Sequence, residues 1–103
     1  MCVCMKNDKK FIINESKRYL AELREEVKSC KSVSDFYFNN KIEELIFNMV
    51  NKINYNTKYK YDLSYGYENN GYDLYSGNNN AMLVEVKNNK IEVNDNVLQL
   101  LLK

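Results

Sequence analysis

The sequence predicts an α+β fold: an N-terminal antiparallel helix hairpin, then a three- or four-stranded antiparallel β-meander and a short C-terminal helix. The period of the apolar residues supports this prediction. They recur every three or four positions as far as residue 54, as in amphipathic helices, and every second position from residue 57, as in strands. No linker or repeat interrupts the 103 residues, so we expect a single domain over residues 1–103.

Two helices are expected in the first half of the chain. The first covers residues 14–30, where its buried stripe repeats at helical spacing: Ser16, Leu20, Leu23, Val27 and Cys30. The second covers residues 34–54, is capped by Ser32 or Ser34, and has a longer stripe: Phe38, Ile42, Leu45, Ile46, Met49, Val50 and Ile53. Residues 1–10 are expected to be disordered, although the first helix could extend back towards Asp8.

Strands and turns alternate in the second half. Asn70-Gly71 is a strong signal for a two-residue type I′ turn and would place Tyr67 opposite Leu74. Residues 76–80 form the next turn. Asn88-Asn89 forms the last one, which places Val86 opposite Ile91 and Val84 opposite Val93. Residues 94–103 are expected to form the closing helix.

The turns agree on which side of each strand faces the core. The predicted inner face holds Leu63, Tyr65, Tyr67, Leu74, Met82, Val84, Val86, Ile91 and Val93. The predicted outer face holds Asp73, Tyr75, Leu83, Glu85 and Lys87.

The composition limits the chemistry. The chain has no histidine, which excludes Ser-His-Asp, Cys-His and histidine-metal catalysis. Its three cysteines do not form a disulfide framework, and its net charge of +1 is small for a nucleic-acid-binding domain. No membrane span or signal peptide is visible, and the 17 Asn and 13 Lys against 2 Arg follow AT-rich codons. We therefore expect a cytoplasmic protein of a bacterium, or of a phage or mobile element in an infected cell.

Three charged residues of the predicted outer face suggest a site. Glu85 and Lys87 point the same way because side chains of a strand alternate, and Asp73 shares their face on the neighbouring strand. Carboxylates so placed could hold Mg²⁺ or Mn²⁺, which would polarise a phosphodiester and activate a water molecule. Lys87 could orient that water or stabilise developing negative charge.

Residues 40–103 resemble the PD-(D/E)xK nuclease superfamily, in particular the archaeal-type Holliday-junction resolvases. The similarity rests on Tyr72-Asp73-Leu74, on a turn, and on Met82-Leu83-Val84 leading into Glu85-Val86-Lys87. The resemblance implies a metal-dependent nuclease acting on DNA, with Glu85 and Lys87 catalytic and Asp73 and Glu85 on the metal ion. It also implies a carboxylate from the preceding helix, for which Glu43 or Glu44 is the candidate.

Other hypotheses remain open. The three charged residues could be ordinary residues on the solvent-exposed face of an antiparallel sheet. A degenerate relic of the nuclease fold, and a homodimer, are also open. From another class, the chain could be a non-enzymatic inhibitor that binds a host defence complex, as an anti-CRISPR protein does. Tyr75 and Leu83 would then be binding residues, because both are apolar and lie on the predicted outer face.

Overall fold

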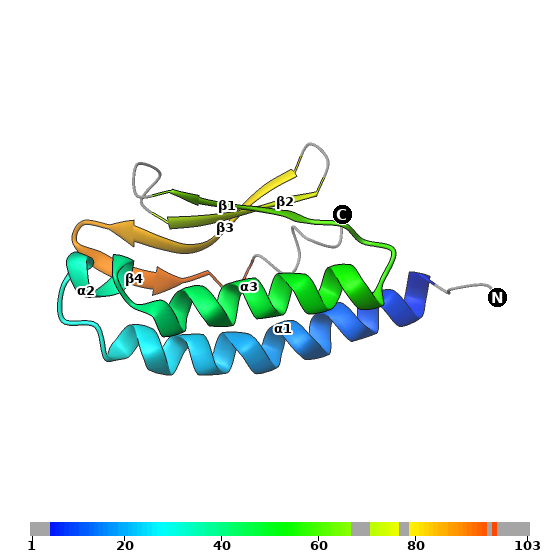
Figure 1. Ribbon diagram of the computed structural model, residues 1–103, viewed down its shortest axis with the longest axis horizontal. Helices are drawn as coiled ribbons and strands as arrows, with labels where there is room; N and C mark the ends of the chain where they lie inside the picture. Colours follow the sequence, from blue (N-terminus) through cyan, green and yellow to red (C-terminus); the bar gives the residue numbers. More distant parts are fainter. Residues whose placement is uncertain (1–4, 67–70, 77–78, 95, 97–103) are drawn as a thin grey trace.

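The computed structural model describes residues 5–66, 71–76, 79–94 and 96, and it has the α+β architecture expected from the sequence. Helices come first and a four-stranded antiparallel sheet follows, with the strands in chain order (Figure 1). The elements are α1 (Met5–Lys28), α2 (Val33–Tyr37), α3 (Asn40–Asn56), β1 (Asp62–Gly66), β2 (Gly71–Ser76), β3 (Asn79–Lys87) and β4 (Lys90–Val93). The predicted C-terminal helix lies mostly outside the described residues.

Helix α1 begins nine residues earlier than the predicted start at residue 14. Residues 5–10 are helical, so the expectation of disorder is wrong for this part of residues 1–10, and residues 1–4 are not described. Asp8 explains part of the difference. Its carboxylate is buried and accepts a hydrogen bond from the backbone N–H of Lys58 at 2.9 Å. This bond ties the first turns of α1 to the segment that enters the sheet.

The predicted second helix is two helices. The helix is interrupted at Phe38 and Asn39. The Asn39 side chain accepts hydrogen bonds from the backbone N–H groups of Lys41 and Ile42, so it caps α3 and starts a new helix. Ser32 caps α2 in the same way. Phe38 was assigned to the apolar stripe but is 77% exposed, since it lies at the junction between the helices.

Helices α1 and α3 pack side by side along their length (Figure 1). Apolar side chains fill the contact, and one ionic cluster bridges it at the surface. The Glu15 carboxylate of α1 lies 2.6 Å from the Arg18 guanidinium and 3.4 Å from the Lys52 ammonium of α3. The helix pair covers one face of the sheet (Figure 1).

The β3–β4 hairpin matches the sequence prediction. Asn88 and Asn89 form its two-residue turn with φ of 53° and 63°, the left-handed conformation that a type I′ turn requires. Val86 lies opposite Ile91, and Val84 lies opposite Val93. Asparagine tolerates this conformation better than most residues, which is why the turn could be predicted.

The β1–β2 pairing differs from the prediction. Leu74 lies opposite Leu63, four positions from the predicted partner Tyr67, and Gly71 is the first residue of β2 rather than part of a two-residue turn. The shift is an even number of residues, so the predicted inner residues of these strands keep their face. Gly71 is required by its neighbours: a Cβ at this position would lie 2.1 Å from the carbonyl oxygen of Val84.

A β-bulge in β3 changes which residues enter the core. Tyr72 pairs with Val84 and Asp73 pairs with Met82, so Leu83 is the extra residue between the two pairs. Leu83 is fully buried next to fully buried Val84, and Met82 is half-buried on the other face. The prediction that Met82 faces inward and Leu83 outward is therefore wrong.

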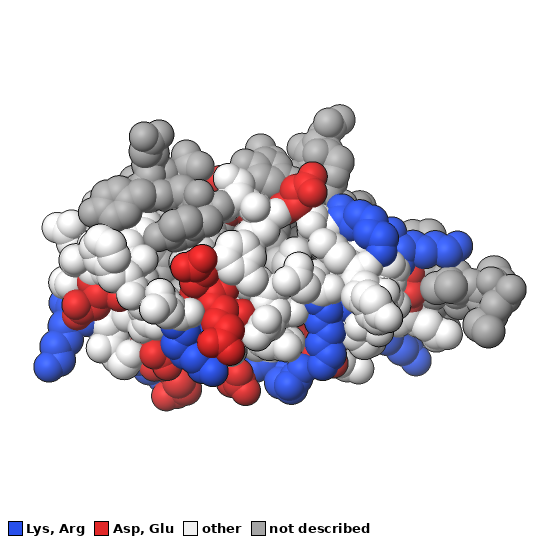
Figure 2. All heavy atoms as spheres, viewed as in Figure 1, with Lys and Arg blue, Asp and Glu red and all other residues white. Residues whose placement is uncertain are grey.

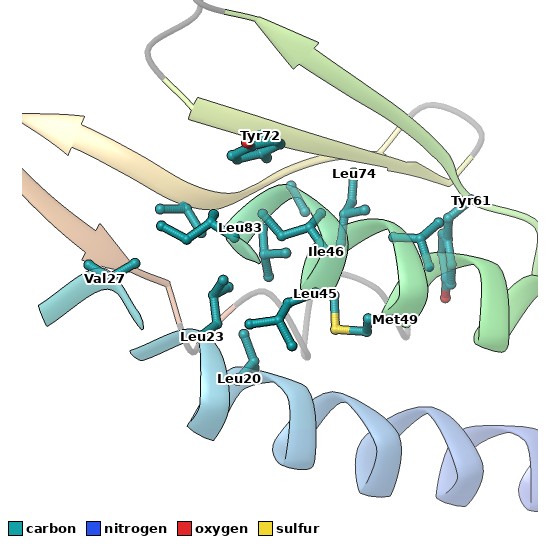
Figure 3. Packing of buried hydrophobic residues seen from close by; sticks show 14 of the residues in the cluster. Leu20, Leu23, Val27, Leu45, Ile46, Met49, Tyr61, Tyr72, Leu74 and Leu83 are labelled. Carbon is teal, nitrogen blue, oxygen red and sulfur yellow. The ribbon is translucent and has the colours of Figure 1, made fainter. Parts of the chain in front are cut away.

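The core lies between the helix pair and the inner face of the sheet. Figure 3 shows Leu74 and Leu83 of the sheet reaching towards Ile46 of α3. Tyr72 is also fully buried and makes an edge-to-face contact with Phe36 of α2, with ring centroids 5.8 Å apart. No helix among the described residues is long and apolar enough to cross a membrane.

Candidate functional site

The structure places Asp73, Glu85 and Lys87 on the outer face of the sheet, opposite the helix pair. Glu85 of β3 lies across from Gly71 of β2. Asp73 is two residues beyond Gly71 in β2, so the carboxylates of Asp73 and Glu85 are diagonal neighbours. Lys87 is two residues beyond Glu85 in β3, on the same face and beside the turn. The structure thus brings Asp73, Glu85 and Lys87, three of the proposed site residues, onto one surface.

Each of the four strands contributes a carboxylate to this outer face. Glu92 of β4 lies directly opposite Glu85, and Asp62 of β1 lies diagonal to Asp73. We call these four residues the acidic row: Asp62, Asp73, Glu85 and Glu92. Within the described part of the chain, none of them forms an ion pair. The two outer members are exposed and the two central ones are half-buried.

Like charges lie opposite each other in two residue pairs on the outer face of the β3–β4 hairpin. Glu85 faces Glu92, and Lys87 faces Lys90 beside the turn. Directly opposed like charges destabilise a sheet. The helices differ, because there Lys and Glu side chains are interspersed along the exposed side (Figure 2). Lys28, for example, lies 3.2 Å from Glu25.

The third proposed metal ligand is not part of this surface. Glu43 lies on α3, which packs against the inner face, so the sheet separates it from Asp73 and Glu85. The neighbouring candidate Glu44 is on the same helix. Over residues 5–66, 71–76, 79–94 and 96, no group of three histidine, cysteine or acidic side chains is arranged to hold a metal ion.

The proposed binding pair Tyr75 and Leu83 is not an exposed pair. Leu83 is completely buried because the bulge turns it towards the helices, so its assignment as a binding residue is wrong. The backbone of Tyr75 pairs with Asp62 and Asn80, and its side chain lies outside the described part of the structure.

A groove that the sequence did not predict lies between the end of α1 and the β3–β4 hairpin. It has a volume of about 350 Å³. Its lining comes from two distant parts of the chain: Val27, Lys28, Cys30, Lys31 and Ser32 on one side, and Asn89, Lys90, Ile91 and Glu92 on the other. Lys28 and Lys31 belong to the first third of the sequence, where basic residues outnumber acidic ones, and this excess is a partial indication of a positively charged surface. Their proximity to Lys90 follows only from the packing of β4 against α1.

Cys30 in this groove is not suited to nucleophilic chemistry. Its thiol is half-buried and donates a hydrogen bond to the carbonyl oxygen of Glu26 at 3.6 Å. Burial raises the pKa of the Cys30 thiol, and only the thiolate is a good nucleophile.

No protein-family model, curated protein or solved structure matches this chain.

Proposed function

We propose that the protein is a non-enzymatic inhibitor that binds a basic, nucleic-acid-binding surface of a host defence protein through its acidic row. The observation that carries this proposal is the row itself: one carboxylate from each strand on one face, with no ion pair in the described part of the chain. A basic protein surface that contacts nucleic acid is built to receive a row of negative charges. Carboxylates of the inhibitor would occupy the places of phosphates.

The cost of the row in the free protein supports a binding role. Glu85 and Glu92 repel each other across the hairpin, and a lysine at either position would remove that repulsion. A cationic partner offsets the repulsion only in the complex. Affinity should then fall steeply with salt, because exposed charges interact over roughly 10 Å at 0.1 M ionic strength.

Two triple variants with the same change in net charge test the proposal. The outer-face variant is Asp73→Asn, Glu85→Gln and Glu92→Gln. The matched control carries Glu22→Gln, Glu25→Gln and Glu44→Gln on the exposed sides of the helices. Immobilised wild-type protein would be used to capture a partner from a bacterial lysate, and the partner's affinity for each variant would then be measured by calorimetry.

We expect the captured partner to be a basic nucleic-acid-binding protein. The outer-face variant should bind it about tenfold more weakly, since three exposed charge pairs of roughly 0.2–1 kcal/mol each amount to about 0.6–3 kcal/mol. The helix control should bind within about twofold of wild type. Equal loss in both variants would mean that only net charge matters, and no loss in either would refute the role of the acidic row.

A metal-dependent nuclease is the second candidate, favoured by the shared face of Asp73, Glu85 and Lys87. The two carboxylates could hold Mg²⁺ or Mn²⁺, with Lys87 beside the ion. A cleavage assay on single-stranded, duplex and branched DNA with either metal tests this candidate, with Glu85→Gln as the variant. Metal-dependent cleavage that the variant lacks would establish the nuclease and overturn the inhibitor proposal.

A further inference from the structure

The groove at the end of α1 runs beside the free edge of the sheet. Among the described residues, β4 is an edge strand that pairs only with β3. Figure 1 shows β4 next to the end of α1 and to α2. The groove is lined by Ile91 and its two neighbours from this strand and by residues 27–32 from the other side. Its volume of about 350 Å³ is within the range of peptide- and ligand-binding pockets, roughly 300–1,000 Å³.

The pairing pattern shows which backbone groups of β4 point away from β3. In an antiparallel pair, hydrogen-bonded and non-hydrogen-bonded positions alternate. The N–H of Asn94 donates to the carbonyl oxygen of Leu83 at 2.8 Å, which makes this pair a hydrogen-bonded one. The same series continues at Glu92 and Lys90. The backbone N–H and C=O of Ile91 and Val93 are therefore directed to the free edge, and Ile91 lines the groove.

The rim of the groove is positively charged. Lys28 and Lys31 stand on the helix side and Lys90 on the strand side, with Glu92 as the single acidic residue of the lining. Lys28 also lies 3.2 Å from Glu25, but both side chains of this pair are more than 70% exposed, so the contact is weak. Three lysines against one glutamate favour an anionic occupant. The lining also includes the apolar side chains Val27 and Ile91.

We propose that this groove binds an extended acidic segment of a partner protein, which adds to the sheet as a fifth strand beside β4. Main-chain hydrogen bonds to Ile91 and Val93 give such a segment its affinity. Its apolar side chains meet Val27 and Ile91, and its carboxylates meet the three lysines of the lining. This surface has the opposite charge from the acidic row and shares only Glu92 with it, so it is an interaction site beyond the proposed inhibition.

Binding of a fluorescent peptide, acetyl-(Glu-Val)₃-amide, tests the proposal. We expect saturable binding below about 1 mM. We also expect chemical-shift changes and slower hydrogen exchange at the amide protons of Ile91 and Val93. Two further versions of the peptide are N-methylated on every second amide, one on the odd-numbered amides and the other on the even-numbered ones. One of them should lose binding, because its strand-pairing donors are blocked although its charge is unchanged.

Charge variants of the full chain complete the test. Lys31→Glu and Lys90→Glu should each weaken peptide binding about five- to tenfold, whereas Lys17→Glu, exposed on α1 away from the groove, should change it less than twofold. Melting curves of all three variants check that each is folded.

Three outcomes would overturn the proposal: no binding at about 1 mM, equal binding of both methylated peptides, or displacement of the peptide by inorganic phosphate at low millimolar concentration. The last two would assign the groove to a small anion instead of a strand.

Discussion

The two faces of the sheet differ in composition and in surroundings. The inner face is apolar and covered by α1 and α3, and its central residues Tyr72, Leu74, Leu83 and Val84 are at most 1% exposed. The outer face carries one carboxylate on every strand. The comparison teaches that the stability of the fold and its proposed function depend on different sides of the same strands. Substitutions on the inner face should therefore change the free energy of unfolding, and those on the acidic row should chiefly change binding.

The largest expected effect comes from two adjacent residues of β3 that face opposite ways. Leu83→Ala should lower the free energy of unfolding by about 3 kcal/mol, because it leaves a cavity in the core. Met82→Ala, on the outer face, should cost about 1 kcal/mol, since the side chain is only half-buried. Chemical denaturation of both variants measures the difference. A larger loss for Met82→Ala would contradict the bulge and support the pairing expected from the sequence.

A smaller gain is expected on the helix side of the core. The hydroxyl of Ser16 is buried in α1 and has no hydrogen-bond partner among the residues that the structure describes. Ser16→Ala removes this unsatisfied group and adds a better helix former, so it should raise the free energy of unfolding by about 1 kcal/mol. Thermal and denaturant melts measure the gain. A loss of stability would show that the hydroxyl is hydrogen-bonded in solution.

A still smaller gain is expected on the outer face. Glu92→Lys converts the repulsive pair with Glu85 into an attractive one and should add about 0.5 kcal/mol to the free energy of unfolding. Glu44→Lys on α3 makes a similar charge change without a residue opposite and should add nothing. If both variants gained equally, the effect would come from net charge and not from the cross-strand pair.

The smallest effect concerns the pH dependence of the helix pair. The Arg18 guanidinium, with the Lys52 ammonium, holds the pKa of Glu15 below its ordinary value. Because the folded-state pKa is the lower one, the stabilisation is complete above the unfolded pKa of about 4.3 and is lost as the pH falls through the folded pKa. Glu15→Gln should thus be less stable than wild type at pH 7 and approach it at pH 3. A constant difference between the two pH values would contradict this role of Glu15.

The sequence predicted those features that depend on local residue patterns. The helical stripes apart from Phe38, the facing of the described strand residues apart from Met82 and Leu83, and the Asn88-Asn89 turn all follow from neighbouring residues, and the structure has them. The α2–α3 break was missed because Phe38 continues the apolar stripe while Asn39 caps the next helix with its side chain. The apolar spacing at Phe38 favours a continuous helix and the Asn39 cap favours a new one, and the structure follows the cap.

The errors at the site arose from pairing between strands. The bulge at Leu83 depends on how β2 meets β3, and only Gly71 marks the close approach of the two backbones. The chemistry of Asp73 and Glu85 was proposed from their shared face, which the structure has. Glu92 is not among the site residues predicted from the sequence, although the predicted hairpin register already places it opposite Glu85. Glu43 was added from the resemblance alone, and α3 carries it to the other side of the sheet.

The acidic row is tested most directly by competition with nucleic acid. The captured partner would be bound to fluorescently labelled DNA or RNA, and wild-type protein or one of the two triple variants would be added. We expect the wild type and the helix control to displace the nucleic acid in the same concentration range, and the outer-face variant to need a concentration about ten times higher. Displacement by all three at the same concentration, or a partner that binds this protein and nucleic acid together, would contradict the account.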